Sequence, residues 1–310
     1  MQSAWTRRQM LGGVAAAVPM AAALASTTAA TPAGPVAPGA TTPALSATEL
    51  GRWRIPEANQ AAAVDAQHFY GIGNRTLVKH RKSDGVRVAE WRGARDGAII
   101  HFNAGYVDAG KLVLAHSNFP QLPTASSLET HDAATLQPVA THSFGIRLGS
   151  LTWAVRHRGF WWACFANYND SGTTPGFDQR WTHVGQFDDA WQMQQSWLFP
   201  AQVIATWGRS SCSGGDWGDD GFLYVTGHDA AELYVLRLPR QGVTLEYVTT
   251  IAVPFEGQGW AWDRSVSGER VIYGISRARQ EIIAARIPPL HAVDASSVAA
   301  NLLVGCRPHG

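Results

Sequence analysis

The sequence predicts an all-β fold built from repeated units of four strands, and two observations lead to this prediction. Aromatic and β-branched runs alternate with turns rich in Gly, Asp and Pro, and no long stretch has helical periodicity. In addition, one pattern recurs: a short run, a turn with Gly or Asp, and a second strand that ends in polar residues. Five segments share this pattern, namely 64–74, 100–118, 151–169, 215–229 and 259–277.

The second strands of these segments are the clearest elements, and they are residues 68–72, 112–115, 160–164, 222–226 and 271–275. Each is followed by two more strand-like runs, such as 232–238 and 245–253 in the fourth unit. Four strands per unit, repeated radially at a spacing near the usual blade length of about 40–50 residues, are typical of a β-propeller. Five blades fit between residues 61 and 288, and a sixth would need the stretch 169–211. Residues 52–55 are predicted to complete the last blade and close the ring.

The amino terminus has the features of an export signal. Arg7 and Arg8 precede an apolar run that ends at Ala23-Leu24-Ala25, which supplies small residues at a signal-peptidase site. Paired arginines resemble the twin-arginine signal, with an ordinary secretory signal as the alternative. We therefore expect a signal peptide over 1–25, a flexible linker over 26–47, the propeller over 48–288 and a tail over 289–310. The expected location is periplasmic or secreted, and the export partner is the twin-arginine machinery.

Composition excludes several classes of protein. With 45% apolar and 16% charged residues, the chain is neither disordered nor a coiled coil. Of the 25 basic residues, two lie in the signal, which leaves 23 against 24 acidic residues and no surplus for binding nucleic acid. No stretch after the signal reaches the ~18 apolar residues of a membrane span. Three cysteines allow at most one disulfide.

Polar residues of all five blades are expected to converge on one rim of the central channel. The first strand of each propeller blade lines the channel and begins at the face where the second strand ends. Polar groups there must be satisfied, by the protein or by a ligand. The candidate binding residues are Asp65, Asn74, His101, Asn118, Asn167, Asp229, Gln258, Trp260 and Arg277. The alternative for each Asn and Asp is a turn that ties neighbouring blades together.

The candidate catalytic residues are His116, His228 and Asp216. The two histidines occupy equivalent positions, within one residue, on two blades. Together they could hold a divalent metal ion, or one could act as a general base. A structural role with a satisfied hydrogen bond is the alternative for each. No standard zinc-binding spacing occurs, so the cofactor and any metal ligands stay undefined.

The turn 211–221 contains three aspartates, which supply the oxygen ligands that a hard cation prefers. We expect Asp216 to face the rim with the two histidines, while Asp219 and Asp220 close a hairpin at the other end of the channel. Two long loops, 119–127 and 170–180, are expected to wall the pocket. Trp181 could then provide an aromatic platform for a sugar or another polar ring.

Three segments carry a family resemblance: 115–120 (AHSNFP), 145–153 (GIRLGSLTW) and 226–236 (TGHDAAELYVL), extended by 254–259 (PFEGQG) and 262–264 (WDR). Over residues 50–288 the chain resembles a largely uncharacterised group of secreted bacterial β-propeller proteins, some of which are described as cycloisomerase-like. The resemblance implies the fold and no catalytic residues. Five-bladed propeller glycosidases usually have an Asp where Asp65 stands and a catalytic Glu in the third blade, where this sequence has no Glu at the rim.

Two functions follow from these residues. The first is an enzyme that acts on a polar carbohydrate or carboxylate, as a hydrolase, lyase or isomerase that uses His116 and His228. The second is a non-catalytic propeller that binds a glycan or peptide at the same rim. The sequence leaves open whether the protein is an enzyme.

Overall fold

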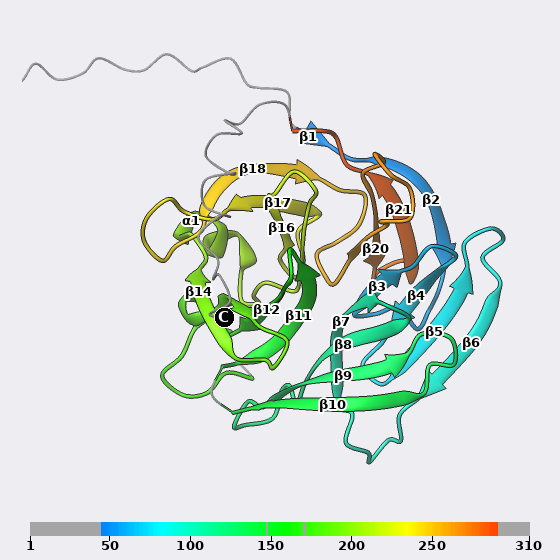
Figure 1. Ribbon diagram of the computed structural model, residues 1–310, viewed down its shortest axis with the longest axis horizontal. Coiled ribbons are helices and arrows are strands. Elements are labelled where there is room, and N and C mark those ends of the chain that lie inside the picture. The colour runs from blue at the N-terminus through cyan, green and yellow to red at the C-terminus, as the bar shows by residue number, and fades with distance from the viewer. Residues whose placement is uncertain (1–44, 147, 170–171, 291–310) are drawn as a thin grey trace, which may run out of the picture. The chain divides into compact units, whose positions relative to one another are not determined.

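The structure, a computed structural model, describes residues 45–146, 148–169 and 172–290. In these residues five sheets of four strands surround a central axis, and one sheet gains a further short strand (Figure 1). Contacts between the first strands of neighbouring sheets run in chain order and close the ring, from β3 through β7, β11, β15 and β19 back to β3. The all-β fold with five blades is therefore confirmed.

Each of the first three blades is a simple antiparallel meander. Blade 1 consists of β3 (Ala61–Val64), β4 (His68–Ile72), β5 (Thr76–Arg81) and β6 (Arg87–Arg92). Blade 2 consists of β7 (His101–Asp108), β8 (Lys111–Ser117), β9 (Ser126–Asp132) and β10 (Pro138–Gly145). Blade 3 consists of β11 (Ser150–His157), β12 (Phe160–Ala166), β13 (His183–Phe187) and β14 (Met193–Leu198).

The last two blades have the same order of strands, except that the outermost strand of blade 5 comes from the start of the folded chain. Blade 4 consists of β15 (Gly214–Trp217), β16 (Leu223–Thr226), β17 (Glu232–Arg237) and β18 (Glu246–Ala252). Blade 5 consists of β19 (Ala261–Trp262), β20 (Val271–Ser276), β21 (Glu281–Arg286) and β2 (Thr48–Arg54).

Strand β2 closes the propeller as the sequence predicts. It pairs antiparallel with β21, and Trp53 lies opposite Ile282. The short strand β1 (Leu45–Ser46), within the predicted linker, pairs parallel with β18 of blade 4. The first described residues therefore add strand pairing that joins blades 4 and 5.

The stretch that a sixth blade would have occupied contains other elements. A 3₁₀ helix lies between β12 and β13 within blade 3, and one turn of α-helix followed by a second 3₁₀ helix lies between blade 3 and blade 4. These are η1 (Gln179–Trp181), α1 (Ala201–Ile204) and η2 (Ala205–Trp207). Strands β13 and β14 in the same stretch complete blade 3, so the propeller has five blades.

Buried hydroxyl groups tie neighbouring blades together at one face. Ser126 Oγ of β9 donates to Gly149 O (2.6 Å) and accepts from Leu151 N (2.8 Å) at the start of blade 3. Thr226 Oγ1 of β16 donates to Gln258 O (2.6 Å) just before blade 5. These bonds satisfy backbone groups between blades and fix where each first strand begins.

Large aromatic side chains fill the space between the blades. Trp153, Trp162 and Trp217 are buried, and the rings of Trp162 and Trp217 meet edge to face with centroids 4.6 Å apart. A Cβ atom on Gly215 would lie 2.5 Å from the Trp153 ring, so this strand can approach blade 3 only with glycine. The buried cysteines, Cys164 and Cys212, are free thiols.

The predicted signal peptide, the tail after residue 290, Cys306 and part of the loop 170–180 lie outside the described residues. Among the described residues, no helix has both the length and the apolar character that a bilayer span requires.

Candidate functional site

A cavity of about 540 Å³ lies at one mouth of the central channel. It is lined by residues that precede or begin the first strands, such as Gln60 and Ser213, and by residues that follow the second strands. We call this side of the propeller the cavity face, and the side with the turns between first and second strands the opposite face. The volume falls in the range of about 300–1,000 Å³ that is usual for organic ligands.

Corresponding positions of the five blades contribute one large side chain each to this cavity. They lie one to three residues after the second strand of each blade, and in blade order they are Arg75, Phe119, Tyr168, His228 and Arg277. We call them the five-residue ring. Because blades 5 and 1 are neighbours, the two arginines lie in adjacent sectors, as do the two aromatic residues of blades 2 and 3.

His228 links a carboxylate to one of these arginines. Its Nδ1 lies 2.5 Å from Asp229 Oδ1, and its Nε2 lies 3.1 Å from Arg277 Nη1. A guanidinium group can only donate, so Nε2 accepts and the ring proton is on Nδ1, where Asp229 accepts it. The result is a neutral imidazole whose Nε2 lone pair faces an arginine of the cavity.

The cavity is rich in cationic groups. Arg75 donates from Nε to Ile99 O (3.1 Å), and neither Arg75 nor Arg277 forms an ion pair with a described carboxylate. Arg209 also lines the cavity, whereas none of the described lining residues is Asp or Glu. Guanidinium groups in this setting favour carboxylate or phosphate groups, which they can bind through two parallel hydrogen bonds.

An aromatic row forms the side of the cavity at blades 2 and 3. The ring of Phe119 lies 5.3 Å from that of His101 and 5.2 Å from that of Tyr168, measured between centroids. Gly172 supports this row from the neighbouring loop: its φ is +78°, and a Cβ atom there would lie 2.3 Å from the Phe119 ring. Only glycine combines that backbone conformation with such a close approach.

His101 is a neutral member of this row. Burial lowers its pKa to about 4, and the nearby charge of Arg277 acts in the same direction. At neutral pH it therefore carries no charge. The positive charge of the cavity is confined to Arg75, Arg209 and Arg277, and the large side chains that blades 2 and 3 themselves contribute are aromatic or uncharged, although Arg209 lies next to Asn169 of blade 3.

Five of the predicted binding and catalytic residues line this cavity, and a sixth contacts one of them. The lining residues are Asn74, His101, His228, Gln258 and Arg277. Asp229 reaches the site through its contact with His228 and is otherwise exposed. The structure brings these residues together from blades 1, 2, 4 and 5.

His116 is not among the lining residues, contrary to the expectation. It accepts a hydrogen bond at Nε2 from Ile100 N (3.0 Å), and its Nδ1 lies 2.9 Å from Ser127 Oγ, which donates to Glu129 (2.6 Å). Both ring nitrogens are therefore occupied, and burial lowers the pKa of the imidazole. His116 occupies the alternative role, that of a buried histidine with satisfied hydrogen bonds.

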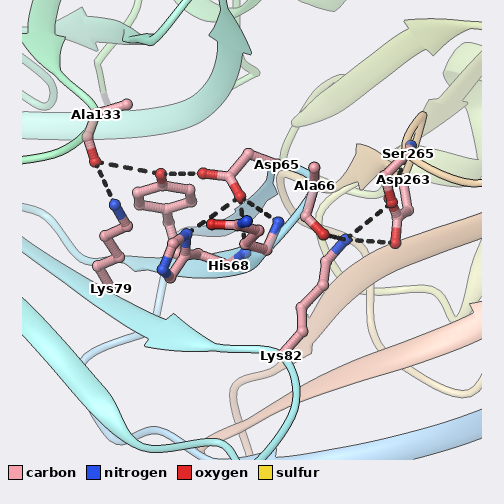
Figure 2. A network of polar contacts seen from close by, with 10 residues as sticks. Asp65, Ala66, His68, Lys79, Lys82, Ala133, Asp263 and Ser265 are labelled. Carbon is pink, nitrogen blue, oxygen red and sulfur yellow. Dashed lines mark hydrogen bonds and ion pairs between the residues drawn. The ribbon is translucent and has the colours of Figure 1, made fainter.

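Asp65 lies on the opposite face. Strand β3 begins in the run of alanines before the predicted segment, so Asp65 follows the end of the strand instead of starting it. Figure 2 shows its surroundings: the carboxylate accepts from the Tyr70 hydroxyl (2.5 Å), whose oxygen lies 3.3 Å from Ala133 O of blade 2, and Lys79 donates to that same Ala133 O (2.8 Å). Lys79 therefore ties blades 1 and 2 together, and Asp65 fixes the Tyr70 side chain beside this contact.

Asp216 is also directed away from the cavity. Strand β15 begins at Gly214, so Asp216 is the third residue of the strand and lies toward the opposite face. It is buried and forms an ion pair with Arg264 Nη2 (3.0 Å). The expectation that it shares a rim with His228 was wrong because the two glycines of the predicted turn belong to the strand.

Asn118 and Asn167 take the structural alternative. Asn118 accepts from Ala125 N (2.8 Å) and donates to Pro123 O (2.9 Å), which shapes the loop after β8. Asn167 is buried, and its backbone N–H donates to Thr182 Oγ1 (3.0 Å). Neither side chain lines the cavity.

Two tryptophans also lie elsewhere. Trp260 is buried and packs edge to face against Trp262 with centroids 5.5 Å apart, so it belongs to the core of blade 5. Trp181 is 52% exposed and lies 4.7 Å from the ring of Phe177. This pair lies on the long loop of blade 3 but outside the cavity lining.

Sequence reasoning missed Arg75 and Tyr168 and did not assign Phe119 a role of its own. A usable signal was present, because each of them follows a correctly predicted second strand by two or three residues. In blades 1 to 3 the predicted residues at these strand ends were asparagines, whereas the larger neighbours reach the channel.

No group of three or more His, Cys, Asp or Glu side chains within residues 45–146, 148–169 and 172–290 is arranged to hold a metal ion. His228 and His101 are the two imidazoles that line the cavity, and they come without a described carboxylate in the lining. The donor set there is cationic and amide in character, which does not fit a divalent cation.

No protein-family model and no curated protein matches the chain. Among solved structures, a chain of the mitotic checkpoint complex is 9% identical with a TM-score of 0.41, and the match covers 86% of this chain and 99% of that one. Hydrazine synthase of Kuenenia stuttgartiensis is 9% identical with a TM-score of 0.42, over 71% of this chain and 68% of that one. Hsv2 of Kluyveromyces lactis is 9% identical with a TM-score of 0.34, over 69% and 55%.

Proposed function

We propose that the cavity binds a small carboxylic acid and that the protein acts on it as a lyase or isomerase. One observation carries the binding proposal: Arg75 and Arg277 lie in adjacent sectors without an ion pair to any described carboxylate, and no described acid lines the cavity. Two guanidinium groups in that arrangement can bind an anionic partner, and a carboxylate fits their hydrogen-bond geometry. A periplasmic or secreted location belongs to the same proposal.

The proposed chemistry is proton transfer by His228. A ligand carboxylate that pairs with Arg277 takes the donor away from His228 Nε2, which can then accept a proton from the carbon next to that carboxylate. Asp229 accepts from Nδ1 and stabilises the imidazolium that forms. In an elimination, the electron pair of the broken C–H bond forms a double bond to the next carbon and expels the group bonded there, which takes the proton from the imidazolium. In an isomerisation, the imidazolium returns the proton to another carbon of the ligand.

A non-catalytic propeller that binds a glycan or peptide is the second candidate. The exposed Phe177 and Trp181 favour it, because an aromatic pair in solvent is a surface on which a sugar ring or an apolar side chain can stack. This function predicts binding of neutral ligands, whereas the first predicts binding of acids.

The test compares Arg277→Gln with Arg279→Gln, which removes the same charge from an exposed residue of the same turn. Binding of carboxylic acids and of their neutral amides is measured by ligand-observed NMR. We expect acids to bind wild type and the Arg279 variant equally, amides to bind neither, and the Arg277 variant to bind acids at least about tenfold more weakly, as a lost charged hydrogen bond implies. Equal binding of acids and amides, or equal loss in both variants, would contradict the proposal.

A further inference from the structure

We infer that the ligand is a planar acid, with an aromatic or conjugated body held by blades 2 and 3 and its carboxylate held by blades 5 and 1. This inference rests on the proposed function and names the class of acid. It derives from the order of the five-residue ring, which separates two kinds of side chain around the mouth of the channel.

The ring divides the cavity into sectors. Blades 5 and 1 contribute Arg277 and Arg75, and blades 2 and 3, next in order, contribute Phe119 and Tyr168. His228 of blade 4 stands where the aromatic sector meets the cationic one. A ligand that satisfies both sectors has a charged end and an apolar end, and its middle lies beside His228.

The aromatic sector is suited to a flat body. Phe119 is fixed between His101, Tyr168 and the close backbone of Gly172, so its ring cannot turn away from the cavity without a shift of the loop. His101 is neutral and adds a third ring to the row. Fixed aromatic rings bind other flat rings by offset stacking or edge-to-face contact.

The same lining disfavours a sugar acid. The hydroxyl hydrogens of a saccharide need acceptors, and carboxylates are the strong acceptors that a protein can offer. None of the described lining residues is Asp or Glu. The neutral acceptors of the lining, which are the amides and hydroxyls of Gln60, Asn74, Asn103, Ser210, Ser213 and Gln258, form weaker hydrogen bonds with sugar hydroxyls than carboxylates do.

The experiment uses benzoate, cyclohexanecarboxylate, glucuronate and benzamide with the full-length protein. The first two have the same charge and nearly the same size but differ in planarity. We expect benzoate to bind about three- to tenfold more tightly than cyclohexanecarboxylate or glucuronate, as aromatic contacts imply. Phe119→Leu should abolish this preference, and Phe177→Leu, an exposed phenylalanine outside the cavity, should keep it.

A second measurement uses wild type alone, so it does not depend on the folding of the Phe119 variant. The ring protons of bound benzoate should shift upfield, because they lie over aromatic faces. Equal binding of the planar and saturated acids, or bound benzoate without that shift, would overturn the inference while leaving acid binding intact. If benzoate binds no better than benzamide, the proposed function itself fails.

Discussion

Arg277 and Arg264 both belong to blade 5, yet they lie at opposite ends of the channel in opposite electrostatic surroundings. On the cavity face, Arg277 contacts a neutral histidine and lies among residues that include no described carboxylate. On the opposite face, Arg264 donates to Asp216, Asp219 and the backbone oxygen of Trp217. The same side chain therefore remains available to a ligand in one place and holds the fold together in the other.

The opposite face repeats this pairing elsewhere. Lys82 of blade 1 donates to Asp263 of blade 5 at 2.6 Å, and Arg270 pairs with Asp220 at 2.9 Å (Figure 2 shows the first pair). Two cavities of about 260 and 660 Å³ lie there, and the cations Arg264, Arg270 and Lys82 in their linings have carboxylate partners. A cavity with charges of both signs already paired has less to gain from an ionic ligand, which is why the site is assigned to the other face.

The largest expected difference between the two faces is in how much an arginine substitution lowers the free energy of unfolding. Arg264→Gln leaves the buried carboxylate of Asp216 without its cationic partner, and we expect it to lower the free energy of unfolding by about 3–5 kcal/mol. Arg277→Gln should change it by less than about 0.5 kcal/mol. Denaturant unfolding of both variants measures the difference. The double variant with Asp216→Asn should recover most of the loss, and equal losses in the two single variants would break the comparison.

A second effect is the dependence of stability on pH. Burial raises the pKa of Asp216 to about 6, although Arg264 opposes the rise. The folded state therefore binds this proton more tightly than the unfolded state, so its contribution to stability is present below about pH 4 and is lost as the pH rises through 6. Relative to Asp216→Asn, wild type should lose up to about 3 kcal/mol between pH 4 and pH 7.

The control for this measurement is Asp219→Asn, which removes an exposed carboxylate beside the same arginine. Asp216 is intact in this variant, so the loss of stability between pH 4 and pH 7 should persist. If the difference in stability between wild type and Asp216→Asn did not change with pH, the Asp216 carboxyl would not titrate in this range.

The smallest expected effect concerns His116 and His228, the two histidines that were predicted to act together. His116→Ala leaves the Ile100 N–H without its acceptor, and we expect a loss of about 1–3 kcal/mol in stability with binding of benzoate within about twofold of wild type. His228 is a third exposed, at 34%, so His228→Ala should leave stability nearly unchanged. For His228→Ala we expect loss of turnover and unchanged binding of benzoate. If His116→Ala abolished turnover and His228→Ala lowered stability, the roles assigned to the two histidines would be exchanged.

Secondary structure was predictable because strand and turn signals are local. The second strand of blade 1 agrees at both ends, 68–72, and β2 was predicted from only its last residues. Strand β3 was placed too late because its alanines have a weak strand propensity, and its burial between neighbouring blades overrides that preference. The misplacement of Asp65 follows from that one boundary.

The site was predictable only in part because it depends on the direction of side chains at strand ends. His228, His101 and Arg277 were found from their positions in the repeat. His116 was predicted to be equivalent to His228, but it is the sixth residue of β8 and lies one residue before the end of that strand, whereas His228 follows the end of β16 by two residues. This difference of three residues relative to the strand end decided which histidine reached the cavity.

The sequence by itself determined the five-bladed ring and its closure by the first strand, because repeated strand patterns and turns act over a few residues each. Only the tertiary structure decided which charges remain for a ligand. Arg264 and Arg277 are 13 positions apart and chemically identical. Asp216, which neutralises the first, comes from another blade, so no local pattern distinguishes the two arginines. That distinction arises when the ring closes and brings blade 4 against blade 5.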